Sequence, residues 1–212
     1  MRLRGGTRFR LLLALALALA ARPVLAWQLG DLFGPCRGDC GVAIYAGNYV
    51  EDSMGEVLLT SPSPPFNWTY VTDDHLVATA ISRRVGRWSR LTFEPEVGIG
   101  QRFGRQSATE VWGALFLRYH GFPWDGTILT TAAISTGINW ADSVTEVEGE
   151  RARDGEGSQW MHFFAPEITF ALPSRPNTEL LLRFHHRSGV FGLVSDAWGG
   201  AQYATVGLRI LF

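Results

Sequence analysis

The chain has 212 residues, of which 46% are hydrophobic and 12% aromatic, with 19 basic and 20 acidic side chains. This length suits a single domain. The first 26 residues hold five of the arginines and no acidic residue, so the remainder has fourteen arginines against twenty acidic residues, a net charge of −6. Such a charge argues against nucleic acid as a partner, because that partner calls for a basic patch.

The N-terminus has the pattern of a secretory signal. Four arginines precede an apolar run of ten residues, and Val24 and Ala26 fit the small-x-small pattern of a signal-peptidase site before Trp27. The apolar run is too short to span a bilayer, which needs about 20 residues. We therefore expect residues 1–26 to be a cleaved signal and residues 27–212 to form one exported domain.

The next feature along the chain is a close pair of cysteines, Cys36 and Cys40. In an exported protein such a pair forms a small disulfide loop more often than a metal site. The pair offers two ligands, and no histidine lies near it in the sequence. We expect a disulfide here and no bound metal.

Eight stretches of about ten to fifteen residues follow, rich in aromatic and β-branched side chains and separated by Gly, Pro, Asp and Ser. They span residues 41–50, 68–84, 90–103, 109–120, 126–140, 160–172, 178–188 and 202–212. In the last six, apolar side chains alternate with charged, hydroxyl or small side chains. This period of two predicts an all-β fold.

Alternation is shared by β-sandwiches and membrane barrels, and three further features favour the barrel. The stretches are long compared with the usual strand of about 5 or 6 residues. Their polar face combines Glu with Arg, Gly and aromatic residues, as a narrow filled lumen would. The last stretch ends on Phe212, which resembles the end of bacterial outer-membrane barrels.

The lengths of the connections agree with a barrel. The connections expected on the periplasmic side, 85–89, 121–125 and 173–177, are short, and three of the four on the other side are long. One long connection holds the acidic segment 146–156, which we expect to be a mobile outward loop. The sequence therefore predicts an eight-stranded antiparallel transmembrane β-barrel of the bacterial outer membrane, formed by residues 27–212.

The stretch 178–188 carries chemistry on the face expected to meet lipid. Leucine and phenylalanine side chains on this face are followed by His186 and Ser188. Ten residues along a tilted strand raise Ser188 roughly 23 Å above the inner rim, close to the top of an apolar band about 25 Å tall. We therefore expect a histidine and a serine side by side on the outer wall, at the depth of the outer leaflet's ester bonds.

An H-x-S motif in this place, followed by glycine and a loop into a final strand that ends on Phe, resembles the outer-membrane lipid A 3-O-deacylases of the PagL type. The match at motif level is confined to His186, Arg187, Ser188 and Gly189. The resemblance implies a Ser, His and acid triad on the outer wall of an eight-stranded barrel. It makes Ser188 the nucleophile, His186 the base, and backbone N–H groups around Gly189 and Val190 an oxyanion hole. The implied reaction is hydrolysis of an ester-linked 3-hydroxyacyl chain of lipid A, the lipid part of lipopolysaccharide, without metal or cofactor.

The sequence departs from the family pattern at two positions. The family usually has Asn directly after the serine, where this chain has Gly189. The family's acid is a Glu near the start of the last strand, but no Glu follows Glu179. Asp196 is the one acidic residue after Ser188 in the sequence and is the candidate that orients His186.

A second interpretation keeps the barrel without the enzyme. In it the protein is a small outer-membrane barrel with a structural or surface-interaction role, and His186 and Ser188 are rim residues that meet lipid headgroups. His185 and Arg187 have the parity of the lumen and are expected to pair with internal acids. The candidate acids are Glu94, Glu96, Glu110 and Glu167.

Overall fold

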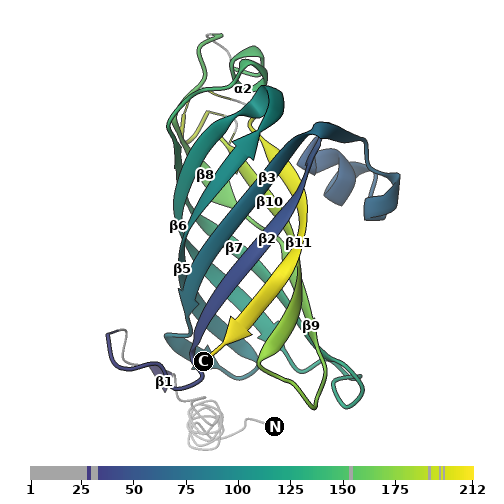
Figure 1. The fold of residues 1–212 in the computed structure, drawn as a ribbon, viewed down its shortest axis with the longest axis vertical. Coiled ribbons are helices and arrows are strands. Elements are labelled where there is room, and N and C mark those ends of the chain that lie inside the picture. The colour runs from purple at the N-terminus through teal and green to yellow at the C-terminus, as the bar shows by residue number, and fades with distance from the viewer. Residues whose placement is uncertain (1–27, 30–32, 153–154, 191, 196, 198) are drawn as a thin grey trace, which may run out of the picture.

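The computed structural model describes residues 28–29, 33–152, 155–190, 192–195, 197 and 199–212, drawn as a ribbon in Figure 1. The barrel wall consists of β2 (Cys40–Val50), β3 (Tyr70–Arg83), β5 (Leu91–Phe103), β6 (Ala108–His120), β7 (Leu129–Ala141), β8 (Trp160–Phe164), β9 (Glu167–Ala171), β10 (Thr178–Ser188) and β11 (Gln202–Leu211). β8 and β9 share one position, because each pairs with both β7 and β10. The described wall therefore has eight strand positions, as predicted, whereas the expected signal 1–26 lies outside the described residues.

The sheet closes on itself because β11 pairs with β10 on one side and with β2 on the other, both antiparallel. The wall is interrupted between β8 and β9, where Pro166 has no backbone N–H to give to the ladder. The neighbouring Ala165 N–H donates instead to the Ser135 hydroxyl at 2.8 Å. Closure confirms the predicted antiparallel barrel and removes the free edges that an open sheet of this size would expose.

Short elements lie at both ends of the barrel. Near the C-terminus, β1 (Gln28–Leu29) pairs with β4 (Gly86–Trp88), where the sequence predicted a plain turn. The other end carries the π-helix η1 (Glu56–Thr60), the 3-10 helices η2 (Pro65–Asn67) and η3 (Gly104–Gln106), and α2 (Glu146–Glu150). Figure 1 shows the segment between β2 and β3 outside the wall and α2 over the opening. No helix within the described ranges is both long and apolar enough to cross a membrane.

The polarity of the wall is inverted relative to a soluble protein. Its outer face carries exposed aliphatic side chains, including Ile44, Val77, Val97, Leu115, Ile138, Leu180 and Val206. The interior holds charged side chains, and Arg102, Arg118 and Arg187 are among the most deeply buried. An apolar outer face around a polar interior is typical of barrels that span a bilayer.

Charged side chains inside the barrel form ion pairs with one another. Arg183 binds both carboxylate oxygens of Glu96, each at 2.8 Å, and its Nε donates to Glu167 at 2.7 Å. His185 Nε2 lies 2.8 Å from Glu110 Oε1, so the predicted pairing of His185 with an internal acid is confirmed. Such pairing offsets part of the cost of placing charge within a membrane.

One acid of this interior was not expected there. Glu148 of α2 is fully buried, with its carboxylate 2.9 Å from Arg102 and 3.5 Å from Arg187. The prediction of a mobile outward loop is wrong for this residue, and Arg187 pairs with an acid outside the predicted set. The cause is the two buried guanidinium groups, which draw a carboxylate of the loop into the mouth of the barrel.

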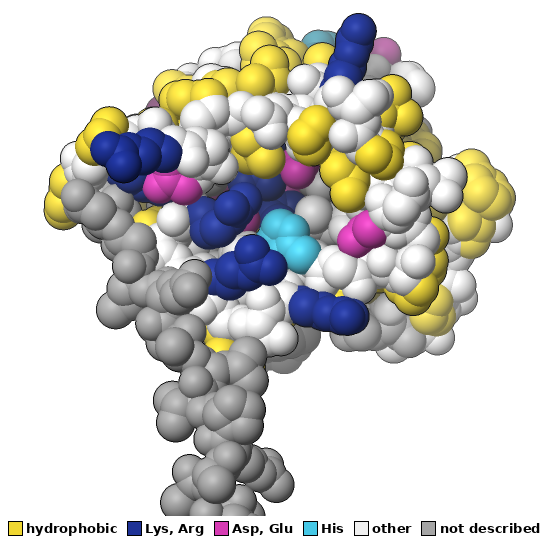
Figure 2. Space-filling view, turned by 90° about the horizontal axis from the view of Figure 1, so that it is seen from below, with side chains coloured by type: hydrophobic (Ala, Val, Ile, Leu, Met, Phe, Trp, Pro, Cys, Tyr) yellow, Lys and Arg dark blue, Asp and Glu magenta, His cyan; other side chains and the backbone are white. Residues whose placement is uncertain are grey.

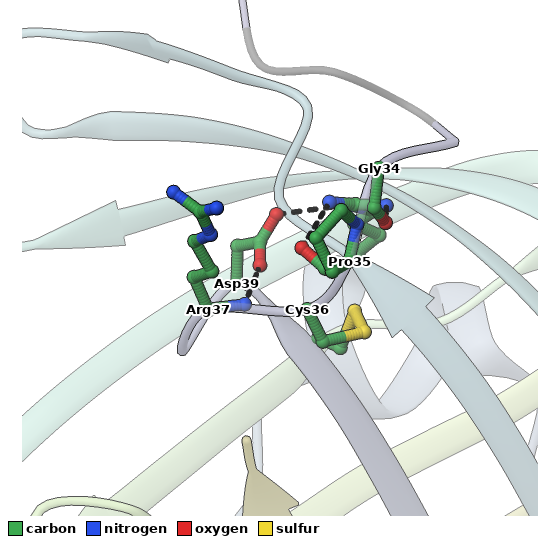
Figure 3. Close-up of a disulfide and its surroundings, with 7 residues drawn as sticks. Gly34, Pro35, Cys36, Arg37 and Asp39 are labelled. Atoms are coloured by element: carbon green, nitrogen blue, oxygen red, sulfur yellow. Dashed lines mark hydrogen bonds and ion pairs between the residues drawn. A yellow bond between two sulfur atoms is a disulfide. The ribbon is translucent and has the colours of Figure 1, made fainter.

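The opposite end is tied together by the predicted disulfide between Cys36 and Cys40. Figure 3 shows Asp39 accepting a hydrogen bond from the Arg37 backbone N–H at 2.7 Å. Arg83 of β3 donates to Asp39 at 2.8 Å and to the Gly34 carbonyl at 2.6 Å. The Arg37 N–H, together with the Arg83 guanidinium, holds the pKa of Asp39 below its usual value. Figure 2 shows arginine side chains gathered around the hollow at this end.

Candidate functional site

The outer face of β10 changes character toward its upper end. Leu180 and Leu182 are 44% and 39% exposed, whereas Phe184 and His186 are only 5% and 7% exposed. The segment between β2 and β3 covers this part of the wall, and Trp68 packs edge-on against Phe184 with ring centroids 5.3 Å apart. The covering segment turns the top of an otherwise open lipid-facing strand into a sheltered site.

His186 and Ser188 line one pocket of about 640 Å³ in this sheltered region. They lie two residues apart on the same face, which places their Cα atoms about 6 to 7 Å apart. The structure therefore places both side chains on the outer wall, as the sequence predicted. Among the described residues no hydrogen bond joins the two, and His186 Nδ1 is buried without a partner. Within the same ranges no cluster of three or more His, Cys, Asp or Glu side chains could hold a metal.

Cross-strand neighbours complete the site. His186 lies opposite Gln202 of β11 and Phe164 of β8, and Ser188 lies opposite His162 of β8. Directly opposed residues on one face of a sheet have Cβ atoms about 4.5 to 5.5 Å apart. The serine therefore has two histidine neighbours, one along its own strand and one across the sheet.

Gln202 is held in a defined orientation beside His186. Its Nε2 donates to the backbone carbonyl of Val50 at 3.2 Å and also to that of Asp52. Because both acceptors bind the amide nitrogen, the carboxamide oxygen is left for the imidazole of its cross-strand partner His186. Gln202 thus occupies the position of a residue that orients the His186 ring.

The structure describes two of the three residues expected to complete the triad and the oxyanion hole. Asp196 lies outside the described residues. A Cβ at Gly189 would lie 1.7 Å from the Ala197 carbonyl oxygen, so no side chain fits there and the family's usual Asn is excluded. Val190 lines the pocket and has a φ of 53°, which is a strained conformation for a β-branched residue. The role of the two backbone N–H groups stays a prediction.

Arg151 forms one border of the pocket. It lies at the C-terminal end of α2 and donates to the carbonyls of Gly200 at 3.1 Å and Glu51 at 3.4 Å. Glu148 of the same helix is fixed inside the barrel by Arg102. One short helix therefore connects the charged lumen with the candidate site on the outer wall.

A second, apolar groove of about 670 Å³ lies on the outer wall beside this pocket. Its lining includes small and aliphatic residues of the wall, such as Ala46, Ala204 and Leu182, and Trp68 from the covering segment. Phe184 also lines the groove and lies two residues before His186 on the same face. The pocket that holds His186 and Ser188 is therefore next to an apolar surface that a hydrocarbon chain can occupy.

Sequence reasoning missed His162, Gln202 and Arg151 as members of the site. His162 has the same parity as the apolar residues Trp160 and Phe164, so the parity that identifies His186 could also have identified His162. Gln202 and Arg151 carry no such signal, because their places depend on strand register and on the fold of a loop.

Comparisons with known proteins add little to this geometry. No protein-family model matches the chain, and no curated protein matches it. The crystal structure of Neisserial surface protein A (NspA) is similar with a TM-score of 0.48 and 11% sequence identity. The alignment covers 84% of this chain and 100% of the neisserial one. At that identity the likeness concerns the course of the backbone alone.

Proposed function

We propose that this protein is an outer-membrane esterase that removes an ester-linked 3-hydroxyacyl chain from lipid A in the outer leaflet. Ser188 is the nucleophile and His186 the general base. The observation that carries the proposal is the shared pocket of Ser188 and His186 on a lipid-facing wall, directly beside an apolar groove. A catalytic serine is useful on the outside of a barrel only when its substrate is itself part of the membrane.

The chemistry follows from the two side chains. The Ser188 Oγ attacks the ester carbonyl carbon while the His186 imidazole takes the hydroxyl proton. The tetrahedral oxyanion then collapses, the bond to the sugar oxygen breaks, and the imidazolium returns its proton to that oxygen. A water molecule, deprotonated by the same imidazole, hydrolyses the acyl-serine and releases the 3-hydroxy fatty acid.

The groove supports a lipid as the substrate. A hydrocarbon chain that runs down the wall past Phe184 to Leu182 places its carboxyl end at Ser188, because six residues of strand cover roughly 20 Å. The covering segment shelters this path from water, as the edge-on contact of Trp68 with Phe184 indicates. The polar sugar would then face the loops, where Arg151 and Gln202 lie.

The orientation of His186 requires a neighbour that accepts its ring N–H. Gln202, the cross-strand partner of His186, supports this role because its amide nitrogen is bound elsewhere and its carboxamide oxygen is left as an acceptor. An amide orients the ring but stabilises the imidazolium less than a carboxylate does, so a Ser-His-Gln site would be slower than a full triad. Asp196, in the loop between β10 and β11, is the alternative orienter.

The test is mass spectrometry of lipid A from Gram-negative cells that express the wild type or Ser188→Ala. Loss of one 3-hydroxyacyl chain only with the wild type supports the proposal. Identical lipid A in both strains, with the barrel folded in the outer membrane, contradicts the esterase proposal. The non-enzymatic surface barrel is then the better account. The described structure has no hydrogen bond between Ser188 and His186, and this observation favours the second candidate.

A further inference from the structure

We propose that His162 is a second catalytic histidine, which donates a hydrogen bond to the oxyanion formed when Ser188 attacks the ester. The inference rests on the proposed function and assigns to the same site a residue outside the H-x-S motif. It starts from the register of the sheet, in which His162 of β8 is the direct cross-strand partner of Ser188.

Three observations place the His162 ring at the pocket that holds Ser188. Both side chains have outward parity, since Met161 and Phe163 on either side of His162 are fully buried in the barrel. Both residues line the pocket that also holds His186. The ring stacks on Phe164, with centroids 6.5 Å apart, which limits the orientations it can adopt.

Thr136 of β7 contacts the Nε2 end of this ring. Its hydroxyl lies 2.9 Å from His162 Nε2, and no hydrogen bond to Nδ1 is formed by any described residue. When the Thr136 hydroxyl donates to Nε2, the proton of a neutral imidazole resides on Nδ1. His162, a lining residue of the pocket, then has a free donor at Nδ1, while His186 remains free to act as the base, so the two histidines have different roles.

The backbone around the serine explains why such a side chain is needed. The position after Ser188 cannot carry a donor side chain, because the Ala197 carbonyl occupies the space beside Gly189. Arg151, the cation of this pocket, already gives hydrogen bonds to two backbone carbonyls. His162 is therefore the side-chain donor that lies directly opposite Ser188 across the sheet.

The experiment compares His162→Phe, His162→Gln and Ser188→Ala with the wild type as refolded full-length barrels. A matched control is His75→Phe, which removes an exposed outer-wall histidine that stacks on Phe103 instead of lining the pocket. Folding is checked by the mobility shift of the unheated barrel on a gel. The readouts are kcat and KM for 3-O-acylated lipid A, and the rate at which a fluorophosphonate labels Ser188.

We expect His162→Phe to lower kcat about 100-fold with little change in KM, as the loss of an oxyanion donor does. Labelling of Ser188 should slow as well, and His162→Gln should recover part of both rates because its amide is a donor. Wild-type rates in folded His162→Phe, or equal losses in the Phe and Gln variants, overturn the role of His162 while Ser188→Ala still tests the esterase. A wild type that neither releases acyl chains nor takes the label overturns both proposals.

Discussion

Replacing Arg183 with methionine should destabilise the barrel much more than the loss of an exposed arginine. Arg183 is fully buried and donates to Glu96 through two hydrogen bonds and to Glu167 through a third. The substitution leaves Glu96 with the Trp112 indole at 3.1 Å, and leaves Glu167 with Arg118 at 2.6 Å. Each carboxylate is then left in the interior with fewer partners.

Breaking a buried pair from one side costs about 3 to 5 kcal/mol of unfolding free energy. The matched control is Arg105→Met, since the Arg105 side chain is 62% exposed and lies 3.5 Å from Asp74. Asp74 is buried, but it keeps the hydrogen bond from the Arg105 backbone N–H in this variant, so losing the water-exposed guanidinium should cost about 0 to 1 kcal/mol. Adding Glu96→Gln to Arg183→Met should restore part of the loss, because it removes one of the stranded charges.

The assay is urea unfolding of the barrel in lipid vesicles, followed by tryptophan fluorescence, with the free energy extrapolated to water for each variant. The result that refutes the reasoning is a loss below about 1 kcal/mol for Arg183→Met, equal to that of Arg105→Met. The interior charges would then be hydrated in the folded barrel instead of depending on one another.

Further predictions concern the site and the disulfide end. Gln202→Ala should lower the deacylation rate more than Asp196→Asn if Gln202 orients His186, and Gln202→Glu should raise it because a carboxylate stabilises the imidazolium. Gly189→Ala should abolish activity in a folded barrel, because its Cβ meets the Ala197 carbonyl at 1.7 Å, whereas Gly113→Ala, with open space around it, should be silent. Asp39→Asn should lower the unfolding free energy, and this loss is fully present above the unfolded pKa of about 3.9 and disappears as pH falls through the lower folded pKa.

Each of these has a plain contrary outcome. A larger effect of Asp196→Asn than of Gln202→Ala in the lipid A assay makes the loop acid the orienter. Full activity in Gly189→Ala shows that the loop after Ser188 adapts without cost. A pH-independent stability difference for Asp39→Asn in urea unfolding contradicts the ionic contacts as its source.

The sequence was sufficient for the barrel because the bilayer imposes one simple rule on every strand. Side chains such as Leu180 and Leu182 must face lipid, so the period of two fixes which residues lie outside. The same rule places His186 and Ser188 on the outer wall from their parity alone. It also explains why the pairing of His185 with an internal acid was predicted correctly, since a side chain of this parity faces the interior of the barrel.

The remaining parts of the site depend on contacts between distant segments, which periodicity does not record. Gln202 and His162 reach the site through strand register, which is set by the whole closed sheet. Glu148 turns inward because Arg102 and Arg187 lie beneath the loop, although its neighbours in sequence suggest an exposed acidic segment. The cover that Trp68 forms over Phe184 likewise needs the long connection to fold back on the wall.

The most direct test of a serine esterase on the outer wall is the release of 3-hydroxy fatty acid from lipid A by the purified, refolded barrel, measured by mass spectrometry. We expect release by the wild type and by Ser107→Ala, a control that removes an exposed rim serine outside the pocket. We expect no release by Ser188→Ala, with the same folded fraction. Equal release by Ser188→Ala and the wild type, or no release by any folded variant, would contradict the proposed activity.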